Sequence, residues 1–161
     1  MIKIGILSDT HGSIHSAVIS LMNECDYIIH AGDIVDESSL SLLKPKQKMI
    51  AVQGNNDQHI GSYGEVEQLD LPGGSIAIEH GHLHGNIQPD HDSLRGAHSE
   101  AKVIVYGHTH KQVIDKAQKP WVINPGSAGQ IRNYGAARCL TIEIENKQDW
   151  DIKSHVFDDI F

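Results

Sequence analysis

Short apolar runs that end in polar, glycine-containing loops recur through the first third of the chain. Three of them are rich in β-branched and other apolar residues and predict buried strands: 2–7 (IKIGIL), 27–31 (YIIHA) and 48–53 (KMIAVQ). Apolar residues at helical spacing predict a helix over residues 14–24, and a shorter helix is predicted over 37–43, before Pro45. This order is typical of a parallel sheet covered by helices, in which ligands bind beyond the carboxyl ends of the strands.

The second half of the chain predicts more strands than helices. Residues 66–71 and 75–79 flank a Pro-Gly-Gly tripeptide, which indicates a hairpin. Residues 80–85 are predicted as a loop and residues 90–100 as a helix with a thin apolar face. Five further runs predict strands: 103–106, 111–115, 121–123, 139–144 and 150–156. Because no repeat or linker divides the chain, we expect one α/β domain over residues 1–161, with two sheets face to face and helices outside.

Composition is that of a globular protein, with 39% hydrophobic residues. There is no apolar run near the ~18 residues of a membrane span, and the chain does not begin with a signal-peptide pattern. The two distant cysteines, Cys25 and Cys139, are expected to be reduced core thiols. We therefore expect a cytoplasmic protein without a membrane partner.

The net charge and the histidine content indicate which kinds of partner, nucleic acid or metal ions, the chain is expected to bind. The formal net charge of −8 argues against nucleic acid, because phosphate backbones are usually bound by a basic face. Metal ions on clustered carboxylates would make the local field positive whatever the total charge. Twelve residues are histidine, the commonest metal ligand among side chains. Five of these histidines are expected on the surface: His15, His59, His91, His98 and His155.

Five polar clusters follow five predicted strands, and each has a glycine beside it. Their candidate metal ligands are Asp9, His11, Asp33, Asn55, His80, His108 and His110. The neighbouring glycines are Gly12, Gly32, Gly54, Gly81 and Gly107, which would let the backbone come close to a bound ion or phosphate. Taken singly, Asp9 suits a turn or a helix cap, Asn55 suits a turn, and His80 is undecided. Together the seven are expected to converge at one edge of a parallel sheet.

Seven nitrogen and oxygen ligands without a thiolate suit Mn²⁺, Fe or Zn²⁺. They are too many for one zinc ion and fit two ions that share a carboxylate, for which Asp33, alone in its cluster, is the natural bridge. Two ions about 3.5–4 Å apart clamp a phosphoryl group and lower the pKa of a shared water toward ~7. The pattern therefore predicts hydrolysis of a phosphate ester with two divalent ions. Mn²⁺ is favoured, while Fe, Zn²⁺ and Ni²⁺ stay open.

The chain resembles the calcineurin-like metallophosphoesterases in five motifs, which occur in the family's order. They are Asp9-x-His11, Gly32-Asp33, Gly54-Asn55-x-Asp57, His80-Gly81 and Gly107-His108-x-His110. The short spacings between them, and an Asn-Pro-Gly-Ser run at residues 124–127, are similar to the small prokaryotic phosphodiesterase branch. The resemblance spans residue 2 to about residue 144.

This resemblance implies a four-layer α/β/β/α sandwich and a role for each candidate ligand. One metal ion would be held by Asp9, His11 and His110. The other would be held by Asn55, His80 and His108, with Asp33 bridging both. A metal-bridging hydroxide would attack phosphorus in line with the leaving oxygen.

One position departs from the wider family, where a histidine in Gly-Asn-His-Asp/Glu is thought to protonate the leaving group or steady the phosphate. Asn56 stands there, and asparagine has no proton to give near neutral pH. The small branch also tends to lack this histidine. Either no side-chain acid is needed, or His82 or His84 supplies the proton. Asn56 therefore favours diesters with good leaving groups over alkyl monoesters.

Three further features are expected near the site. Asp57 is predicted to orient a ligand histidine, with a simple turn carboxylate as the equal alternative. Residues 124–127 are expected to pack a loop beside the site. Arg132 is expected either to pair with a substrate phosphate or to be solvated.

Three other functions stay open besides a phosphodiesterase for small phosphate esters. A eukaryotic retromer subunit resembles this branch and serves mainly as an assembly surface, although a scaffold does not need seven intact ligands. A phosphomonoesterase or nucleotide hydrolase would use the same centre, with three aromatic candidates: Tyr63, Tyr106 and Tyr134. A nuclease needs a basic track, and the one dense basic group is more simply a solvated helix end and loop: Lys44, Lys46 and Lys48.

The oligomeric state also stays open, and a homo-oligomer is one alternative. Four apolar residues near the C-terminus either pack on the core or form a dimer edge: Val156, Phe157, Ile160 and Phe161. Core packing is favoured.

Overall fold

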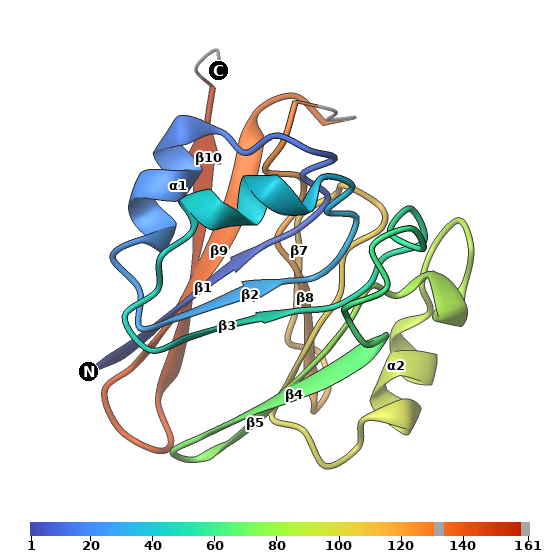
Figure 1. Ribbon diagram of the computed structural model, residues 1–161. Helices are drawn as coiled ribbons and strands as arrows, with labels where there is room; N and C mark the ends of the chain where they lie inside the picture. Colours follow the sequence, from blue (N-terminus) through green and yellow to red (C-terminus); the bar gives the residue numbers. More distant parts are fainter. Residues whose placement is uncertain (131–133, 159–161) are drawn as a thin grey trace.

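Two five-stranded sheets face each other in the computed structural model, which describes residues 1–130 and 134–158 (Figure 1). Sheet A has the strand order β10-β9-β1-β2-β3, and sheet B has the order β4-β5-β6-β8-β7. Sheet A comprises β1 (Ile2–Leu7), β2 (Tyr27–His30), β3 (Lys48–Ala51), β9 (Ala137–Ile144) and β10 (Trp150–Phe157). Sheet B comprises β4 (Val66–Leu71), β5 (Gly74–Glu79), β6 (Val103–Val105), β7 (Val113–Asp115) and β8 (Trp121–Asn124).

Each sheet contains three neighbouring parallel strands, β1, β2 and β3 in sheet A and β5, β6 and β8 in sheet B, so their carboxyl ends lie at one edge. In sheet A, Leu7 of β1 lies beside His30 of β2, and His30 lies beside Ala51 of β3. In sheet B, β5, β6 and β8 are parallel, with Ile78 beside Val105. The other strands, β9 and β10 in sheet A and β4 and β7 in sheet B, pair antiparallel, and β4 with β5 forms the predicted hairpin. The loop after each parallel strand therefore begins at the same edge of its sheet, where such sheets bind ligands.

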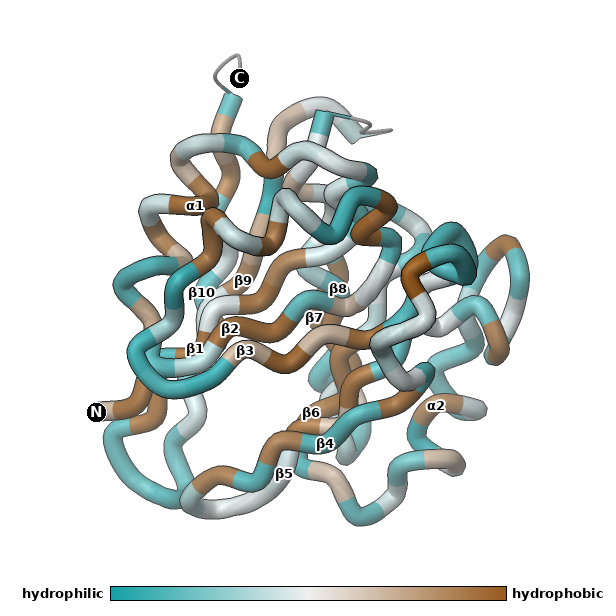
Figure 2. The backbone as a smooth tube through the Cα atoms, viewed as in Figure 1, coloured by the Kyte–Doolittle hydropathy of each residue, from teal (hydrophilic) through white to brown (hydrophobic). Residues whose placement is uncertain are grey.

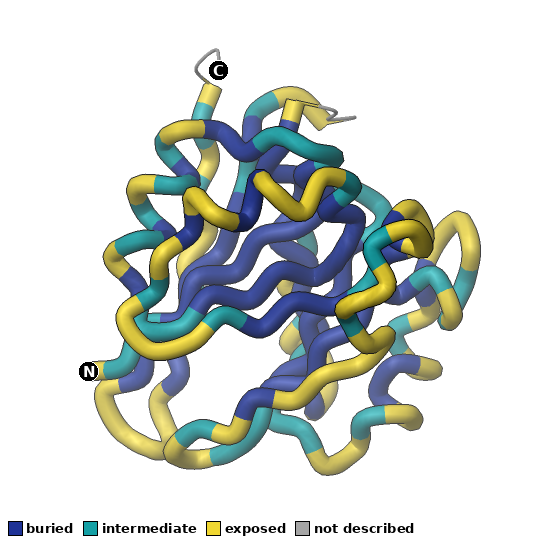
Figure 3. Tube along the Cα trace, viewed as in Figure 1, coloured by how far each residue is buried: buried dark blue, intermediate teal, exposed yellow. Residues whose placement is uncertain are grey.

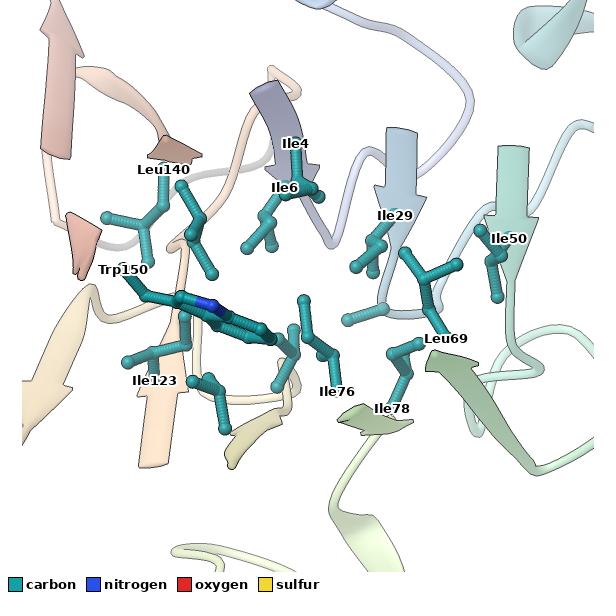
Figure 4. Packing of buried hydrophobic residues seen from close by; sticks show 14 of the residues in the cluster. Ile4, Ile6, Ile29, Ile50, Leu69, Ile76, Ile78, Ile123, Leu140 and Trp150 are labelled. Atoms are coloured by element: carbon teal, nitrogen blue, oxygen red, sulfur yellow. The ribbon is translucent and has the colours of Figure 1, made fainter. Parts of the chain in front are cut away.

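The main hydrophobic core fills the space between the sheets. Ile4 and Ile6 of β1 point from sheet A toward Ile76 and Ile78 of β5, and the Trp150 ring lies among them (Figure 4). All five are at most 4% exposed. Strands β1 and β2 of sheet A form hydrophobic segments in Figure 2 and are buried along most of their length in Figure 3. Burial of each such side chain stabilises the fold by about 1.5–3 kcal/mol.

Helices cover the outer face of each sheet, which gives four layers (Figure 1). The α1 helix (Ser16–Met22) and the 3-10 helix η1 (Glu37–Leu42) pack on sheet A, and α2 (His91–Ala97) packs on sheet B through Leu94. At Gly5 of β1, an added Cβ would lie 2.5 Å from the sulfur of Met22, so a side chain here would displace the Met22 side chain of α1. The predicted α/β class and four-layer α/β/β/α architecture are confirmed.

Several predicted elements are shorter in the structure than in the sequence pattern. The helix predicted over 14–24 is Ser16–Met22, and the one predicted over 90–100 is His91–Ala97. Two segments form 3-10 turns instead of an α-helix and an open loop: η1 and η2 (His82–His84). Caps explain the helix starts, because Asp90 Oδ1 accepts from the N–H groups at the start of α2.

The prediction that His15 lies on the surface is wrong. His15 is 1% exposed, its Nδ1 accepts the Ala17 N–H at 3.0 Å as the cap of α1, and its ring stacks on Phe157. Phe157 thus packs on the core, as expected, whereas Val156 is exposed. Ile160 and Phe161 lie outside the described residues. Of the other four histidines, His59 is exposed, while His91, His98 and His155 are half-buried against polar partners.

Both cysteines are free and buried, as predicted for core thiols. Burial raises the pKa of Cys25 to about 11 and that of Cys139 to about 12. Both thiols are therefore protonated and unreactive at neutral pH. Within the described part of the chain, no helix is long and apolar enough to cross a membrane.

Replacing Asp115 by asparagine is expected to lower the free energy of unfolding by about 1–2 kcal/mol at pH 7. Asp115 Oδ2 lies 2.6 Å from His91 Nδ1 and 3.1 Å from the guanidinium of Arg95, which is only 8% exposed. The hydrogen bond from His91, the Ala117 N–H and Arg95 lower the pKa of Asp115 from 3.8 to about 2. A carboxylate with a lowered folded-state pKa stabilises the fold above its unfolded pKa and loses this effect below it.

The difference in the free energy of unfolding between wild type and D115N should therefore be largest at pH 7. It should decline as the pH falls from about 4 toward 2. Urea unfolding at pH 7 and pH 3 measures it. Asp151→Asn is the control, because Asp151 is 65% exposed and its loss should change stability by less than about 0.5 kcal/mol. An equal deficit of D115N at both pH values would contradict the ion-pair explanation.

Candidate metal centre

Loops after five parallel strands bring the seven predicted ligands together. The strands and the ligands that follow them are β1 with Asp9 and His11, β2 with Asp33, β3 with Asn55, β5 with His80, and β6 with His108 and His110. Backbone hydrogen bonds join the loops of sheet A, since Asp9 N donates to Gly32 O and His11 N donates to Asp33 O, each at 3.0 Å. The His108 N–H of sheet B donates to Asp9 Oδ2 at 3.0 Å, so the site spans both sheets.

Five of the seven residues have a left-handed backbone. Their φ angles are +54° at Asp9, +49° at His11, +57° at Asp33, +74° at His108 and +64° at His110. Residues other than glycine rarely adopt this conformation, which costs about 1–3 kcal/mol each and persists where the surrounding structure enforces it. Such strain, repeated within one cluster of polar side chains, indicates a functional site.

The two aspartates lie at the centre of the cluster. Asp33 presents one carboxylate oxygen to each side: Oδ1 lies 3.4 Å from His80 Nε2, and Oδ2 lies 3.6 Å from His11 Nε2. Asp9 Oδ1 lies 3.6 Å from His110 Nε2 and 3.8 Å from His80 Nε2. The candidate ligands therefore form two groups of three that share Asp9. In each group the three ligand atoms lie within 4.8 Å of one another. One group is Asp9, His11 and His110, and the other is Asp9, Asp33 and His80.

Hydrogen bonds on the far side of each ring turn a lone pair toward the centre. His80 Nδ1–H donates to Ala31 O at 2.8 Å, which leaves Nε2 facing the two aspartates. His108 Nε2–H donates to Asn86 O, which leaves Nδ1 facing Asn55 Oδ1 at 3.2 Å. Histidines that ligate a metal ion usually donate their second N–H to a carbonyl or carboxylate in this way.

Three buried polar atoms of the candidate ligands have no hydrogen-bond partner among the described residues. They are Asp9 Oδ1, His80 Nε2 and His110 Nδ1. The other oxygen of Asp9 accepts hydrogen bonds from Ser8 Oγ at 2.7 Å and His108 N at 3.0 Å, so Oδ1 alone faces the cluster. Unpaired buried atoms that face the centre of the cluster, such as Asp9 Oδ1 and His80 Nε2, fit divalent metal ions, which would satisfy them.

The electrostatics of the site also favour a cation. Burial raises the pKa of Asp9 to about 7, although His80 opposes the rise. Burial would lower the pKa of His80, but the carboxylates of Asp33 and Asp9 outweigh it and raise this pKa to about 9. Burial likewise raises the pKa of Asp33, but hydrogen bonds and charge from His80 and Asn56 outweigh it and lower this pKa well below 3.8. A metal ion bound here would take the place of the His80 proton and keep Asp9 ionised.

Asn56 and Asp57 both support the loop that carries Asp33. Asn56 donates to Asp33 twice, from its backbone N–H at 3.0 Å and from Nδ2 at 2.8 Å. Asp57 is fully buried and accepts the N–H groups of Ile34, Val35 and Gly54. Asp57 was predicted to orient a ligand histidine, but these hydrogen bonds come from backbone N–H groups and not from a histidine ring. Asp57 instead joins the loops after β2 and β3 through their backbone.

Two of the predicted glycines allow close approach at the cluster. A Cβ on Gly54 would lie 2.2 Å from Asp33 Oδ1, and one on Gly107 would lie 2.1 Å from Ser8 Oγ. Any side chain at either position would displace a carboxylate or its hydrogen-bond donor. The glycines were predicted to let the backbone come close to a bound ion or phosphate. In the structure they also make room for a candidate ligand, Asp33, and for Ser8, which holds Asp9.

The two candidate acids, His82 and His84, point in different directions. The ring of His82 lies 5.5 Å from that of His80 and 6.2 Å from that of His108, and its buried Nδ1 has no hydrogen-bond partner among the described residues. Burial, followed by His80 and His108, lowers the pKa of His82. His84 instead contacts Ser93 and Glu79. Of the two, the geometry leaves His82 as the candidate.

The loop at residues 124–127 packs beside the site, as expected. Asn124 Nδ2 donates to Gly107 O at 2.9 Å, and Ser127 Oγ donates to Asp9 O at 2.9 Å. Arg132 lies outside the described residues. The aromatic candidates do not gather at the centre: Tyr106 is fully buried against His91, Tyr63 bonds Glu37, and Tyr134 is half-exposed. The three lysines at 44, 46 and 48 are exposed, as expected for a solvated group.

Three supporting residues were not identified from the sequence. His30 is fully buried, its Nδ1 accepts the Gly32 N–H at 3.1 Å, and its Nε2–H donates to Thr10 Oγ1 at 3.0 Å. Burial lowers the pKa of His30 to about 4, so the ring stays neutral. Ser8 and Asn86 hold Asp9 and His108, as described above. The sequence offered a signal for His30, because a histidine within an apolar strand directly before Gly32 is unusual. No local pattern distinguishes Ser8 or Asn86.

Comparison with known proteins agrees with this site. The model of the calcineurin-like phosphoesterase superfamily domain matches residues 2–147. The chain is 34% identical over 138 residues to probable metallophosphoesterase MJ0623 of Methanocaldococcus jannaschii, covering 77% of this chain and 67% of that protein. It is 32% identical over 148 residues to phosphodiesterase MJ0936 of the same organism, covering 77% and 82%. Wild-type Vps29 of Entamoeba histolytica, complexed with Zn²⁺, has a similar fold, with a TM-score of 0.75 at 16% identity over 96% of this chain and 99% of that one.

The fold and the cluster define a metal-dependent phosphoric ester hydrolase. The chain belongs to the calcineurin-like phosphoesterase superfamily. The resemblance drawn from the five motifs is thereby confirmed.

Proposed function

We propose that this chain is a phosphodiesterase for small substrates, active as one domain over residues 1–161 with two divalent metal ions, of which Mn²⁺ is favoured. One ion would be held by Asp9, His11 and His110. The other would be held by Asn55, His80 and His108, with Asp33 bridging both. The two free, buried thiols agree with a reducing compartment, and we place the enzyme in the cytoplasm.

The position of Asp33 carries this proposal. Its two oxygens face opposite histidines, His80 at 3.4 Å and His11 at 3.6 Å, as a carboxylate shared by two ions would. Asn56 holds the same carboxylate with two hydrogen bonds, so its orientation is fixed before any substrate arrives. Nitrogen and oxygen donors without thiolate are also the set that Mn²⁺, Fe and Zn²⁺ accept.

The reaction divides between the ions and the protein. When bound, two such ions would supply Lewis-acid polarisation of the phosphoryl oxygens and would activate a water molecule for attack on phosphorus. The chain supplies positioning: Ser8 and the His108 N–H fix Asp9, while Asp57 fixes the loops that carry Asp33 and Asn55.

Asn56 supports diesters with good leaving groups as substrates. One hydrogen of its Nδ2 is donated to Asp33, and the amide has no acidic proton to give to the leaving oxygen. An aryl oxide leaves without protonation, whereas an alkoxide needs an acid. The name of the relative MJ0936, a phosphodiesterase, agrees with a diester substrate.

Hydrolysis of a bis-aryl phosphodiester by protein stripped of metal and reloaded with Mn²⁺ tests the proposal. We expect activity only after reloading, with a lower rate on the matching aryl monoester. Bound ions are counted on the same sample by mass spectrometry. Faster hydrolysis of the monoester or of nucleotides would overturn the substrate class. Two bound ions without hydrolysis of any ester would instead favour a scaffold.

Replacing His82 by alanine is expected to lower kcat about 10–100-fold for diesters with alkyl leaving groups and to change it little for aryl ones. The reason is that, of the two candidate acids His82 and His84, only His82 has its ring beside the cluster. The measurement is the pH–rate profile on both substrates, with His155→Ala on β10 as the control. If the profile of H82A equals that of wild type, His82 is not the acid.

A further inference from the structure

A second histidine cluster lies on the outer side of sheet B. Its members are Glu79 at the end of β5, His84 in η2 and His98 just after α2, and we call it the Glu79 cluster. Alternate residues of a strand face opposite sides. Ile78 packs between the sheets while Ala77 packs against α2, so Glu79 shares the α2 side and points away from the inter-sheet core.

Both imidazoles of the Glu79 cluster converge on a single carboxylate oxygen. His84 Nε2 lies 3.1 Å from Glu79 Oε2, and His98 Nε2 contacts the same oxygen. The three atoms lie within 4.8 Å of one another, and the rings are 6.4 Å apart. The Glu79 side chain is 4% exposed, while those of His84 and His98 are 16% and 13% exposed. The carboxylate is therefore buried, and the histidines close the route to it from solvent.

Ser93 of α2 fixes the direction of His84. Its hydroxyl lies 2.7 Å from His84 Nδ1, so the other nitrogen, Nε2, must face Glu79. A hydroxyl can accept a hydrogen bond from Nδ1–H, which leaves a lone pair on Nε2, as at histidines that ligate metal. Zinc bonds of about 2.0–2.2 Å in a tetrahedron place ligand atoms about 3.3–3.6 Å apart. The 3.1 Å between His84 Nε2 and Glu79 Oε2 is close to that edge.

We infer that the Glu79 cluster is a zinc site, distinct from the candidate metal centre. Two imidazoles and one carboxylate are a three-ligand set that zinc accepts, with water in the fourth position. Bound zinc would join η2 to the end of α2 and so hold the segment that follows β5. That segment also carries His82 and Asn86, which contact the candidate metal centre. The inference does not depend on the proposed function.

Counting zinc ions per chain tests the inference. Protein stripped of metal is loaded with Zn²⁺, freed of excess by gel filtration and measured by mass spectrometry. We expect three ions in wild type, two in the double variant H84Q/H98Q, and three in the control H155Q on β10. Glu79→Gln, which keeps the size and hydrogen-bonding oxygen of the side chain, should also lose one ion. Circular dichroism checks that each variant is folded.

The outcomes separate this inference from the proposed two-metal centre. Two ions in both wild type and H84Q/H98Q would overturn the zinc site and leave the two-metal centre standing. One ion in wild type and none in the variant would support the zinc site and contradict the two-metal centre. A second readout needs no variant: zinc should shift the nitrogen-15 resonance of Nε2 in both His84 and His98. Unchanged resonances would overturn the inference.

Discussion

Replacing Asp33 by asparagine is expected to lower kcat/KM for a bis-aryl phosphodiester about 10³-fold, which corresponds to about 4 kcal/mol. The substitution keeps the size of the side chain and removes the charge that faces His80 on one side and His11 on the other. Both ions of the proposed centre would lose a shared anionic ligand, and metal content should fall together with activity. Steady-state kinetics and metal analysis of the same preparation measure the two effects.

Asp36→Asn is the matched control for this prediction. Asp36 lies three residues further along the same segment, caps η1 through Ser38 and faces solvent. Asparagine also caps helices well, so activity should stay within about twofold of wild type. Full activity and full metal content in D33N would contradict the bridging role of Asp33. Loss of activity in D36N as well would point to the fold of the loop instead.

Replacing Trp150 by alanine is expected to lower the free energy of unfolding by about 3–5 kcal/mol. The ring is 4% exposed and lies between the two sheets, where it packs with the isoleucines of β1 and β5 (Figure 4). Its Nε1–H donates to Pro72 O at 3.2 Å, which also joins β10 to the hairpin of sheet B. Alanine would leave a cavity that the surrounding strands cannot close. Urea unfolding of metal-free protein measures the change without a contribution from metal binding.

Trp150→Phe separates packing from the hydrogen bond. Phenylalanine fills much of the same space and loses only the indole N–H, so we expect a smaller deficit of about 1–2 kcal/mol. Tyr134→Ala is the surface control, because Tyr134 is 50% exposed and its loss should cost less than about 0.5 kcal/mol. A deficit below about 1 kcal/mol in W150A would show that the sheets are held by other contacts.

The strands were predictable because their signal is local. Apolar runs such as Ile2–Leu7 and Val66–Leu71 have the predicted bounds, since burial selects β-branched and aliphatic residues position by position. Helix ends were less predictable. The helix predicted from residue 14 begins at Ser16, because the capping bond of His15 depends on backbone geometry that the apolar spacing does not encode.

Convergence of the seven predicted ligands was predictable for a topological reason. Each follows a strand, and parallel strands place their carboxyl ends at one edge. The contacts that these residues make were not predictable, because the residues in contact are far apart in the sequence. His11 and His110 are 99 residues apart, and Asp57 bonds Ile34 and Val35 across more than twenty residues.

The sequence alone therefore determined the α/β class, the strands, the family and the residue types that can hold metal, because each depends on short patterns. Only the tertiary structure decided which atoms meet. It placed His82 beside the cluster and turned His84 toward Glu79, although the two are two residues apart. It also buried His15 and brought His98 onto Glu79 from the far end of a helix. Such contacts are set by the packing of whole elements, and no local pattern records them.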